Sequence, residues 1–379
     1  MMKNIQQLLF LLLGIGMYMS CKKDDFPVPP ASTVPQFTYT LSNNNFAPAT
    51  ATFTNTSIVP DRAGTVTFTW NFGDGTSETG KNATHTYTAP GVYQVNLVAV
   101  TEGSLEIKQA GKTIIIKDPS ATGLPVFFTD GSQVYAGLVN NLTPVFELLP
   151  VTGLQDSYGM TWDSVGLKLY ISDYEGGKIY RCNADGSGQE IFRDGVDSPN
   201  AMSIDYAQRK IYWDTGNGIQ FADLNSTDVN QKTDFVTGQA NDPDGICIDP
   251  QNRNMYWVNY NGGVWKKSLD GGAETEIIAG VEGGSMLVVG NRIYFDQYIA
   301  AGDIQLKSAD LNGGNVAVLA TGITRVVYAL AYNPEDQKIY WGDRNNGAIM
   351  RANLDGSGAE NWFTNADIGP RGLVFGKKI

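Results

Sequence analysis

The sequence is poor in the residues that most nucleophilic enzymes and metal centres use. It contains one histidine and three cysteines among 379 residues. The histidine, His85, lacks the serine or cysteine partner that a catalytic triad needs. The cysteines show no C-x-x-C spacing of the kind found in metal sites. We expect Cys182 and Cys247 to be buried thiols that do not form a disulfide, because the repeats described below put them in different sheets.

Basic residues and long apolar runs are also scarce. Lys and Arg number 27 against 39 Asp and Glu, which gives a formal charge of −12. Nucleic-acid binding needs basic residues to neutralise phosphates, so no nucleic-acid partner is expected. The one apolar run, Leu8 to Met19, lies within "MMKNIQQLLFLLLGIGMYMSC". This run is short for a membrane span, and residues 1–21 are predicted to be a signal peptide.

Cysteine at the end of this segment resembles the cleavage junction of bacterial lipoproteins, although Tyr18 replaces the usual leucine. The following "CKKDD" resembles a tag found on surface-exported lipoproteins. The resemblance implies that Cys21 is lipidated and anchors the protein in the outer membrane, exposed on the cell surface. A plain secretory signal is the alternative. Residues 22–35, "KKDDFPVPPASTVP", are rich in proline and charge and predict an extended tether.

Residues 36–118 alternate between apolar and polar positions, interrupted by Gly, Pro, Asn and Asp. About seven short strands in this length are typical of a β-sandwich. The segments "WNFGDG", "HTY" and "PGVYQV" resemble those of PKD domains, which implies an Ig-like sandwich that serves as a spacer or accessory binding module. Trp70 and Phe72 are then expected in the core, Gly73-Asp74-Gly75 in a turn, and His85 in a structural hydrogen bond.

The rest of the chain repeats itself. A strand with an aromatic pair, or a variant of it, recurs six times: "VFFTD" (126–130), "LYISD" (169–173), "IYWDT" (211–215), "MYWVN" (255–259), "IYFDQ" (293–297) and "IYWGD" (339–343). A period of about 40 to 50 residues with four short strands predicts propeller blades. With "GAIMRANLDGSG" after it, the last copy resembles the YWTD, or LDL-receptor class B, repeats of six-bladed propellers.

The phase of the repeat predicts how the ring closes. The first unit lacks an inner strand before its aromatic strand, and the last unit is followed by a spare one, "GLVFG" (372–376). We therefore expect residues 119–379 to form a six-bladed β-propeller closed by the C-terminal strand. The fold class is all-β, and the protein is expected to be a monomer.

Repeated and non-repeated residues predict different roles. Aspartates recur in the same columns and are expected to hold loop amides, and the recurring aromatic residues are expected to pack between blades. In contrast, the residue before each inner strand varies among the repeats, and these six positions should surround one end of the channel. They are Tyr158, Asn200, Asp244, Gly284, Tyr328 and Arg371. The column after the aromatic strands should add Tyr174, Asn259, Tyr260, Gln297, Tyr298 and Arg344 at the same face.

Tyrosines beside arginines, amides and carboxylates suit recognition of an extracellular glycan, a peptide or a surface protein. No H-E-x-x-H, nucleophile elbow or Walker loop is present, so the first hypothesis is a binding protein without catalysis or cofactor. The alternative is a metal-dependent hydrolase or lyase that resembles gluconolactonases. Asn200 and Asp244 would then be weak calcium ligands, with Glu282 nearby, although calcium prefers six to eight oxygens. A structural scaffold within a surface complex is the third hypothesis.

Overall fold

The computed structural model describes residues 32–102, 105–118, 123–140, 143–239 and 242–377. The predicted signal peptide, Cys21 and most of the tether lie outside these residues. The chain divides into two compact units, residues 1–121 and 122–379. Within the described residues, no helix has the length and apolarity needed to cross a membrane.

The first unit is a β-sandwich of two sheets, with the strand orders β1-β2-β5 and β4-β3-β6-β7. Trp70 and Phe72 are buried between the sheets, as predicted. The sequence suggested only short strands, but β6 and β7 have 11 residues each and form a long hairpin. The elements are β1 (Phe37–Leu41), the 3-10 turn η2 (Asn43–Asn45), β2 (Ala49–Asn55), β3 (Val66–Asn71), β4 (Ser77–Thr79), β5 (Ala83–Tyr87), β6 (Gly91–Thr101) and β7 (Glu106–Ile116).

His85 has the structural role that the sequence predicted. Its Nε2 lies 2.7 Å from Asp74 Oδ2, and its ring stacks on Phe72 with centroids 4.2 Å apart. Gly73 and Gly75 take positive φ angles of 85° and 91°, so the chain turns there as expected. The histidine therefore secures the turn that carries Asp74.

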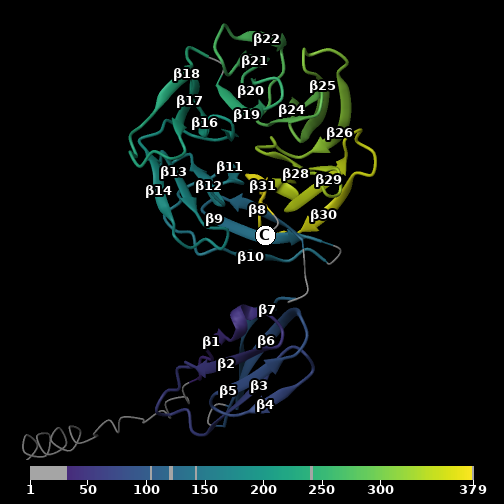
Figure 1. Cartoon of the computed structure of the whole chain (residues 1–379). Coiled ribbons are helices and arrows are strands. Elements are labelled where there is room, and N and C mark those ends of the chain that lie inside the picture. The colour runs from purple at the N-terminus through teal and green to yellow at the C-terminus, as the bar shows by residue number, and fades with distance from the viewer. Residues whose placement is uncertain (1–31, 103–104, 119–122, 141–142, 240–241, 378–379) are drawn as a thin grey trace, which may run out of the picture. The chain divides into compact units, whose positions relative to one another are not determined.

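The second unit is a ring of six four-stranded antiparallel sheets, which confirms the six-bladed propeller (Figure 1). We number the blades from the one that contains β8. The inner strands of blades 1 to 6 are β31 (Leu373–Phe375), β11 (Met160–Asp163), β15 (Met202–Asp205), β19 (Pro243–Asp249), β23 (Met286–Val289) and β27 (Leu330–Asn333). The aromatic strands are β8 (Leu124–Asp130), β12 (Lys168–Asp173), β16 (Lys210–Thr215), β20 (Asn254–Asn259), β24 (Arg292–Ala300) and β28 (Lys338–Asp343).

Two further strands complete each blade on its outer side. The third strands are β9 (Gln133–Val139), β13 (Lys178–Cys182), β17 (Gly218–Asp223), β21 (Val264–Ser268), β25 (Asp303–Asp310) and β29 (Ala348–Asn353). The outer strands are β10 (Phe146–Leu148), β14 (Glu190–Asp194), β18 (Thr233–Val236), β22 (Thr275–Ile278), β26 (Ala317–Ile323) and β30 (Glu360–Thr364). A second 3-10 turn, η3 (Arg344–Asn346), follows β28.

The C-terminal strand closes the ring, as the phase of the repeat predicted. Strand β31 pairs antiparallel with β8, with Leu373 opposite Phe128 and Phe375 opposite Val126 (Figure 1). Each inner strand contacts the inner strands of both neighbouring blades, including β31 with β11 and β27. Without β31, the inner side of β8 would be an unpaired strand edge.

Aromatic residues of the repeat pack between blades, as expected. The largest fully buried side chains of the ring include Tyr170, Tyr212, Trp213, Trp257 and Trp341. The cysteines lie in different blades, Cys182 in β13 and Cys247 in β19, and both are free thiols. Burial raises the pKa of each to about 11, so both are uncharged at neutral pH.

Candidate functional site

One end of the central channel is built by the starts of the six inner strands. The residue directly after each predicted mouth residue is small in every blade. These residues are Gly159, Ala201, Gly245, Ser285, Ala329 and Gly372. The backbones approach so closely that a Cβ on Gly159 would lie 1.7 Å from the carbonyl oxygen of Asn200. Small residues are therefore required here, and the residue before each is held at the channel mouth.

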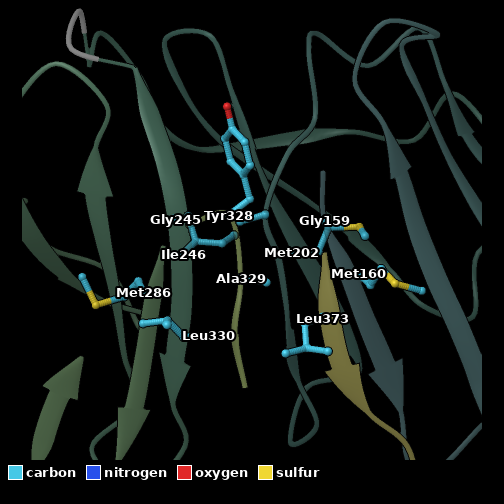
Figure 2. A pocket seen from close by; sticks show the side chains of 11 residues that line it. Gly159, Met160, Met202, Gly245, Ile246, Met286, Tyr328, Ala329, Leu330 and Leu373 are labelled. Atoms are coloured by element: carbon cyan, nitrogen blue, oxygen red, sulfur yellow. The ribbon is translucent and has the colours of Figure 1, made fainter. Parts of the chain in front are cut away.

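Below this layer the channel is apolar. Met160, Met202, Ile246, Met286, Leu330 and Leu373 line a cavity of about 50 Å³. Figure 2 shows the Tyr328 ring extending to one side of this cavity, with Leu330 and Leu373 further along the channel. The mouth is thus a polar layer above a narrow apolar neck.

The same residue position in several aromatic strands accepts hydrogen bonds that hold the mouth residues in place. Ser172 Oγ accepts a hydrogen bond from Gly159 N (3.0 Å), and Asp214 Oδ1 accepts one from Asn200 N (3.0 Å). In blade 5, Asp296 Oδ1 accepts from Gly284 N and Ser285 N, both at 2.8 Å. Asp296 Oδ2 also accepts from Val327 N of the next blade at 3.1 Å. A hydroxyl or carboxylate at this position therefore ties the start of an inner strand to its surroundings in four of the six blades.

Tyrosines and arginines gather on one side of the mouth. The rings of Tyr158 and Tyr328 lie 4.5 Å apart between centroids, and Tyr174 packs edge-on against Tyr158 at 5.4 Å. The guanidinium of Arg371 lies 4.5 Å from the centroid of Tyr158, and that of Arg344 lies 4.4 Å from the centroid of Tyr328. Cation–π contacts of this kind fix the planes of both tyrosines.

Asp156 completes this side of the mouth. Its carboxylate forms a salt bridge with Arg371 and accepts a hydrogen bond from the hydroxyl of Tyr158 at 2.8 Å. Burial and the bond to Asp156 raise the pKa of Tyr158 above its ordinary value. We name Tyr158, Tyr328, Arg344, Arg371 and Asp156 the tyrosine–arginine cluster.

Acidic residues occupy another part of the mouth. Asn200 and Asp244 are buried and joined by a hydrogen bond from Asn200 Nδ2 to Asp244 Oδ1. Burial and the mutual repulsion of Asp214 and Asp244 raise the pKa of Asp214 well above its ordinary value, and burial raises that of Asp244. Burial likewise raises the pKa of Asp242. The two parts of the mouth therefore differ in charge.

The structure brings together most of the residues that the sequence placed at the mouth. Tyr158, Tyr174, Tyr328, Arg344 and Arg371 are in contact as described above. Asn200 and Asp244 form the second group. Tyr260 is near enough to Tyr328 to raise its pKa electrostatically, although burial is the larger cause and the pKa of Tyr328 is about 12.

Two predicted positions behave differently from the rest. Gly284 contributes no side chain, and a Cβ there would lie 2.6 Å from Val326 Cγ1. Tyr298 was expected just beyond an aromatic strand, but β24 continues to Ala300 and Tyr298 pairs with Ile304. Its side chain is exposed and makes no ring contact with the cluster in the described part of the chain.

Sequence reasoning missed Asp156, Asp214, Asp242 and Asp296. Asp214 and Asp296 share a column with Thr129 and Ser172, so a hydrogen-bond acceptor recurs there in four of six repeats. The sequence could have revealed this position only through the acceptor oxygen that these side chains share, because the residues themselves are not identical. Asp156 and Asp242 each lie two residues before a mouth residue, Tyr158 and Asp244, so an alignment of the repeats on the mouth residues would have brought these aspartates together.

The side chains of the mouth fit poorly around a calcium ion of the kind that gluconolactonase-like enzymes hold. Asn200 Oδ1 is buried and has no hydrogen-bond partner among the described residues. However, Asp214 Oδ1 is already bonded to Asn200 N. No group of three or more His, Cys, Asp or Glu in the described ranges is arranged to hold a metal. The donor set is therefore short of what calcium prefers.

At the other end of the inner strands the repeated aspartates act as the sequence predicted. Asp163 accepts a hydrogen bond from Val165 N at 3.0 Å, and Asp249 accepts one from Gln251 N at 2.9 Å. Asp163 also binds Arg209 of the next blade through two bonds of 2.7 and 2.5 Å, which the sequence did not reveal. This end of the ring is held together by repeated contacts.

Comparison with known proteins agrees with the two-unit architecture. Residues 33–114 match the PKD domain family. The first unit is a PKD domain. Residues 153–302 of the propeller match the model described as an SMP-30/Gluconolactonase/LRE-like region. This second match covers four of the six inner strands.

Curated relatives are distant. Protein cueball of Drosophila grimshawi is 27% identical over 209 residues, which are 52% of this chain and 34% of that protein. Protein cueball of Drosophila erecta is 26% identical over 130 residues, 32% of this chain and 20% of that protein. The chain thus spans about a third or less of the length of these relatives.

Solved structures share the propeller fold. The structure titled "Crystal structure of Nidogen/Laminin Complex" has a TM-score of 0.57 at 18% identity and covers 67% of this chain and 98% of its own. TolB from Acinetobacter baumannii has a TM-score of 0.53 at 12% identity, covering 76% of this chain and 81% of its own. These likenesses agree with the six-bladed β-propeller that follows the PKD domain.

Proposed function

We propose that the protein is a surface lipoprotein whose propeller binds an extracellular ligand at the mouth that Tyr158, Tyr328 and Arg371 surround. The carrying observation is that tyrosine faces and arginines gather there, above an apolar neck, at the six positions where the repeat does not repeat. Such a combination of aromatic faces and directed polar groups is typical of ligand sites. The PKD domain would act as a spacer or accessory module between anchor and ring.

Binding is tested with the purified full chain on an array of glycans and peptides. We expect bound ligands to be lost, at least tenfold in affinity, in Tyr328→Ala and Arg371→Ala. Tyr206→Ala is the control, because Tyr206 is another tyrosine that flanks an inner strand, but it lies at the opposite end. Binding that survives both mouth substitutions would move the site elsewhere. A partner protein retained from outer membranes, with no array ligand, would favour the scaffold hypothesis.

The lipid anchor is tested separately. Cys21→Ser should abolish incorporation of a labelled fatty acid and release the protein from the membrane fraction. Cys182→Ser is the control, because Cys182 is buried in the propeller and should leave labelling unchanged. Labelled Cys21→Ser protein would contradict the anchor.

A metal-dependent hydrolase or lyase is the second candidate, which the SMP-30/Gluconolactonase/LRE-like match favours. The buried, unpartnered Asn200 Oδ1 beside Asp244 is the feature that supports it. Calorimetry with Ca²⁺ on the wild type and Asp244→Ala separates the two functions. Tight binding that the substitution removes would favour the enzyme, and absence of binding would favour the binding protein.

A further inference from the structure

Arg344 differs from the other arginines around it. It begins the turn η3 after β28, is half-buried, and lies over Tyr328. Among the described residues, no carboxylate forms an ion pair with it, and its buried Nε has no hydrogen-bond partner. Arg371, its neighbour in the tyrosine–arginine cluster, is in contrast paired with Asp156.

The lack of a partner is not general for buried arginines of this ring. Arg193 is fully buried without a carboxylate, but its guanidinium donates to the carbonyl oxygens of Phe192 and Asp223. Arg209 and Arg253 each bind an aspartate of the preceding blade. Arg344 alone of these has neither arrangement, and it stands at the candidate site.

Electrostatics make this arrangement costly in the free protein. Burial lowers the pKa of Arg344, and the positive charges of Arg325 and Arg371 lower it further. Asp244 acts on Arg344 from a distance, but its Oδ1 is already bonded to Asn200. The side chain of Tyr328 interacts with Arg344 by a hydrogen bond and opposes this lowering of its pKa, but it brings no carboxylate. A half-buried guanidinium without a carboxylate partner gains most from a ligand that brings one, because arginine binds a carboxylate through two parallel hydrogen bonds.

The surroundings of Arg344 indicate what carries that carboxylate. The neighbouring faces of Tyr158 and Tyr328 suit the CH face of a sugar ring. Asp156, which binds Arg371 and the Tyr158 hydroxyl, offers its remaining lone pairs as acceptors for hydroxyl groups. A peptide would need a pocket for an anchoring side chain, yet the cavity below is only about 50 Å³. For scale, a cavity of about 150 Å³ is what benzene occupies in another protein.

We propose that the mouth binds an acidic sugar, a uronic acid residue of a glycan, with its carboxylate on Arg344 and its ring against Tyr328. This assignment rests on the proposed function and narrows it to one ligand class. Because the whole chain carries a charge of −12, no general attraction for anions would explain such binding. The preference for the acid must then come from Arg344 itself.

The test uses the full chain and oligosaccharides of galacturonate and glucuronate, each paired with its carboxyl-reduced neutral form. Calorimetry on the wild type should show at least tenfold tighter binding of the acid than of its reduced counterpart. Arg344→Gln should bring this ratio close to one. Arg62→Gln is the matched control, because it removes the same charge from an exposed arginine of the PKD domain and should keep the ratio.

Three outcomes would overturn the proposal: equal binding of both forms, an unchanged ratio in Arg344→Gln, or binding of neither sugar. The proposed function fails by a different result. If the acid binds but Tyr328→Ala has no effect, the mouth is not the site, and both proposals fall. If neutral glycans or peptides bind, and Tyr328→Ala abolishes their binding while Arg344→Gln does not, only the uronate assignment falls.

Discussion

The two ends of the inner strands are built by opposite rules. Where the strands end, Asp163, Asp205 and Asp249 recur, and each accepts hydrogen bonds from the amides of its own turn. Where the strands begin, the six residues of the mouth differ from blade to blade. Each blade needs the same turn to fold, so the fold dictates repetition at one end. Nothing in the fold demands variety at the other.

Repetition in a propeller therefore marks structure, and its absence marks a place where other demands act. Blade 4 shows both in one strand. Its Asp249 holds the following turn, whereas its Asp244 lies in the mouth, where burial raises the pKa of the carboxyl. A substitution at the repeated end should therefore change stability alone. One at the mouth should change binding, and the fold should tolerate it better.

Removing β31 should lower the stability of the propeller most, because the deletion takes away a mouth residue and the strand that closes the ring. Deletion of residues 371–379 removes Arg371 from the mouth and the strand that pairs with β8. Leu373 is 3% exposed, and a large apolar side chain contributes about 1.5–3 kcal/mol when buried. With the lost pairing, this approaches the net stability of about 5–15 kcal/mol of a typical domain. We expect the cooperative melting of the propeller to be lost.

The measurement is circular dichroism or calorimetry on heating. Deletion of residues 378–379 alone is the control and should melt as the full chain does. An intact transition after deletion of residues 371–379 would show that pairing of β31 with β8 does not hold the ring.

Breaking one contact between blades at the repeated end should cost less. Asp163→Ala removes both bonds to Arg209 and leaves that guanidinium, a quarter exposed, without its partner. Loss of one partner of a buried pair costs about 3–5 kcal/mol, and the exposure of Arg209 favours a value of about 2–4 kcal/mol. The midpoint of urea unfolding should fall accordingly, while ligand binding at the mouth stays unchanged.

Asp185→Ala is the matched control for this prediction. Asp185 also accepts hydrogen bonds from its own turn, from Ser187 N and Oγ, but it is exposed and lacks an arginine. A smaller loss is therefore expected. If the two substitutions cost the same, the contact between blades adds nothing to the turn.

Much of the fold was predictable because it depends on repeated positions. The aromatic strands gave the number of blades, and the missing first inner strand predicted the role of residues 372–376. The role of Asp214 and Asp296 was not predictable, because Thr129 and Ser172 accept the equivalent hydrogen bonds with a different group. Arg209 was also hidden, since its reach across blades depends on a turn where it takes a positive φ of 54°.

The mouth was predictable as a set of positions but not as an arrangement of charge. Two positions of the repeat, one before each inner strand and one after each aromatic strand, placed its residues at one end of the ring. The sequence did not show that Arg371 would be paired and Arg344 left over, because it does not tell which arginine the carboxylate of Asp156 reaches. Strand length differed from the expectation in blade 5, where β24 continues past Tyr298. The N–H of Tyr298 nevertheless donates to the carbonyl oxygen of Glu282, as the N–H of Tyr260 donates to that of Asp242.

Neutralising an acidic residue of the mouth should change the free energy of unfolding least, and it should raise this free energy where the other substitutions lower it. Burial raises the pKa of Asp244, so the folded state holds a proton that the unfolded state has released. Stability from this group is present below the unfolded pKa of 3.8 and is lost as pH rises through the folded value. Asp244→Asn keeps the acceptor Oδ1 and carries no charge. It should therefore have a higher free energy of unfolding than the wild type at pH 8, because the unfavourable ionisation of the buried carboxyl is removed.

The difference should shrink as the pH falls toward 3, where the wild-type carboxyl is largely protonated in both states because the pH is then below the unfolded pKa of 3.8. Asp185→Asn provides the contrast, because hydrogen bonds from Ser187 lower the pKa of Asp185. Its carboxylate stabilises the fold above the unfolded pKa, so this variant should be slightly less stable than the wild type at pH 8. Melting curves from about pH 3 to pH 8 on both variants measure the two signs. If Asp244→Asn is less stable than the wild type at pH 8, as Asp185→Asn is expected to be, a positive charge already stabilises the Asp244 carboxylate. The acidic part of the mouth would then not differ in charge from the part that holds Arg344.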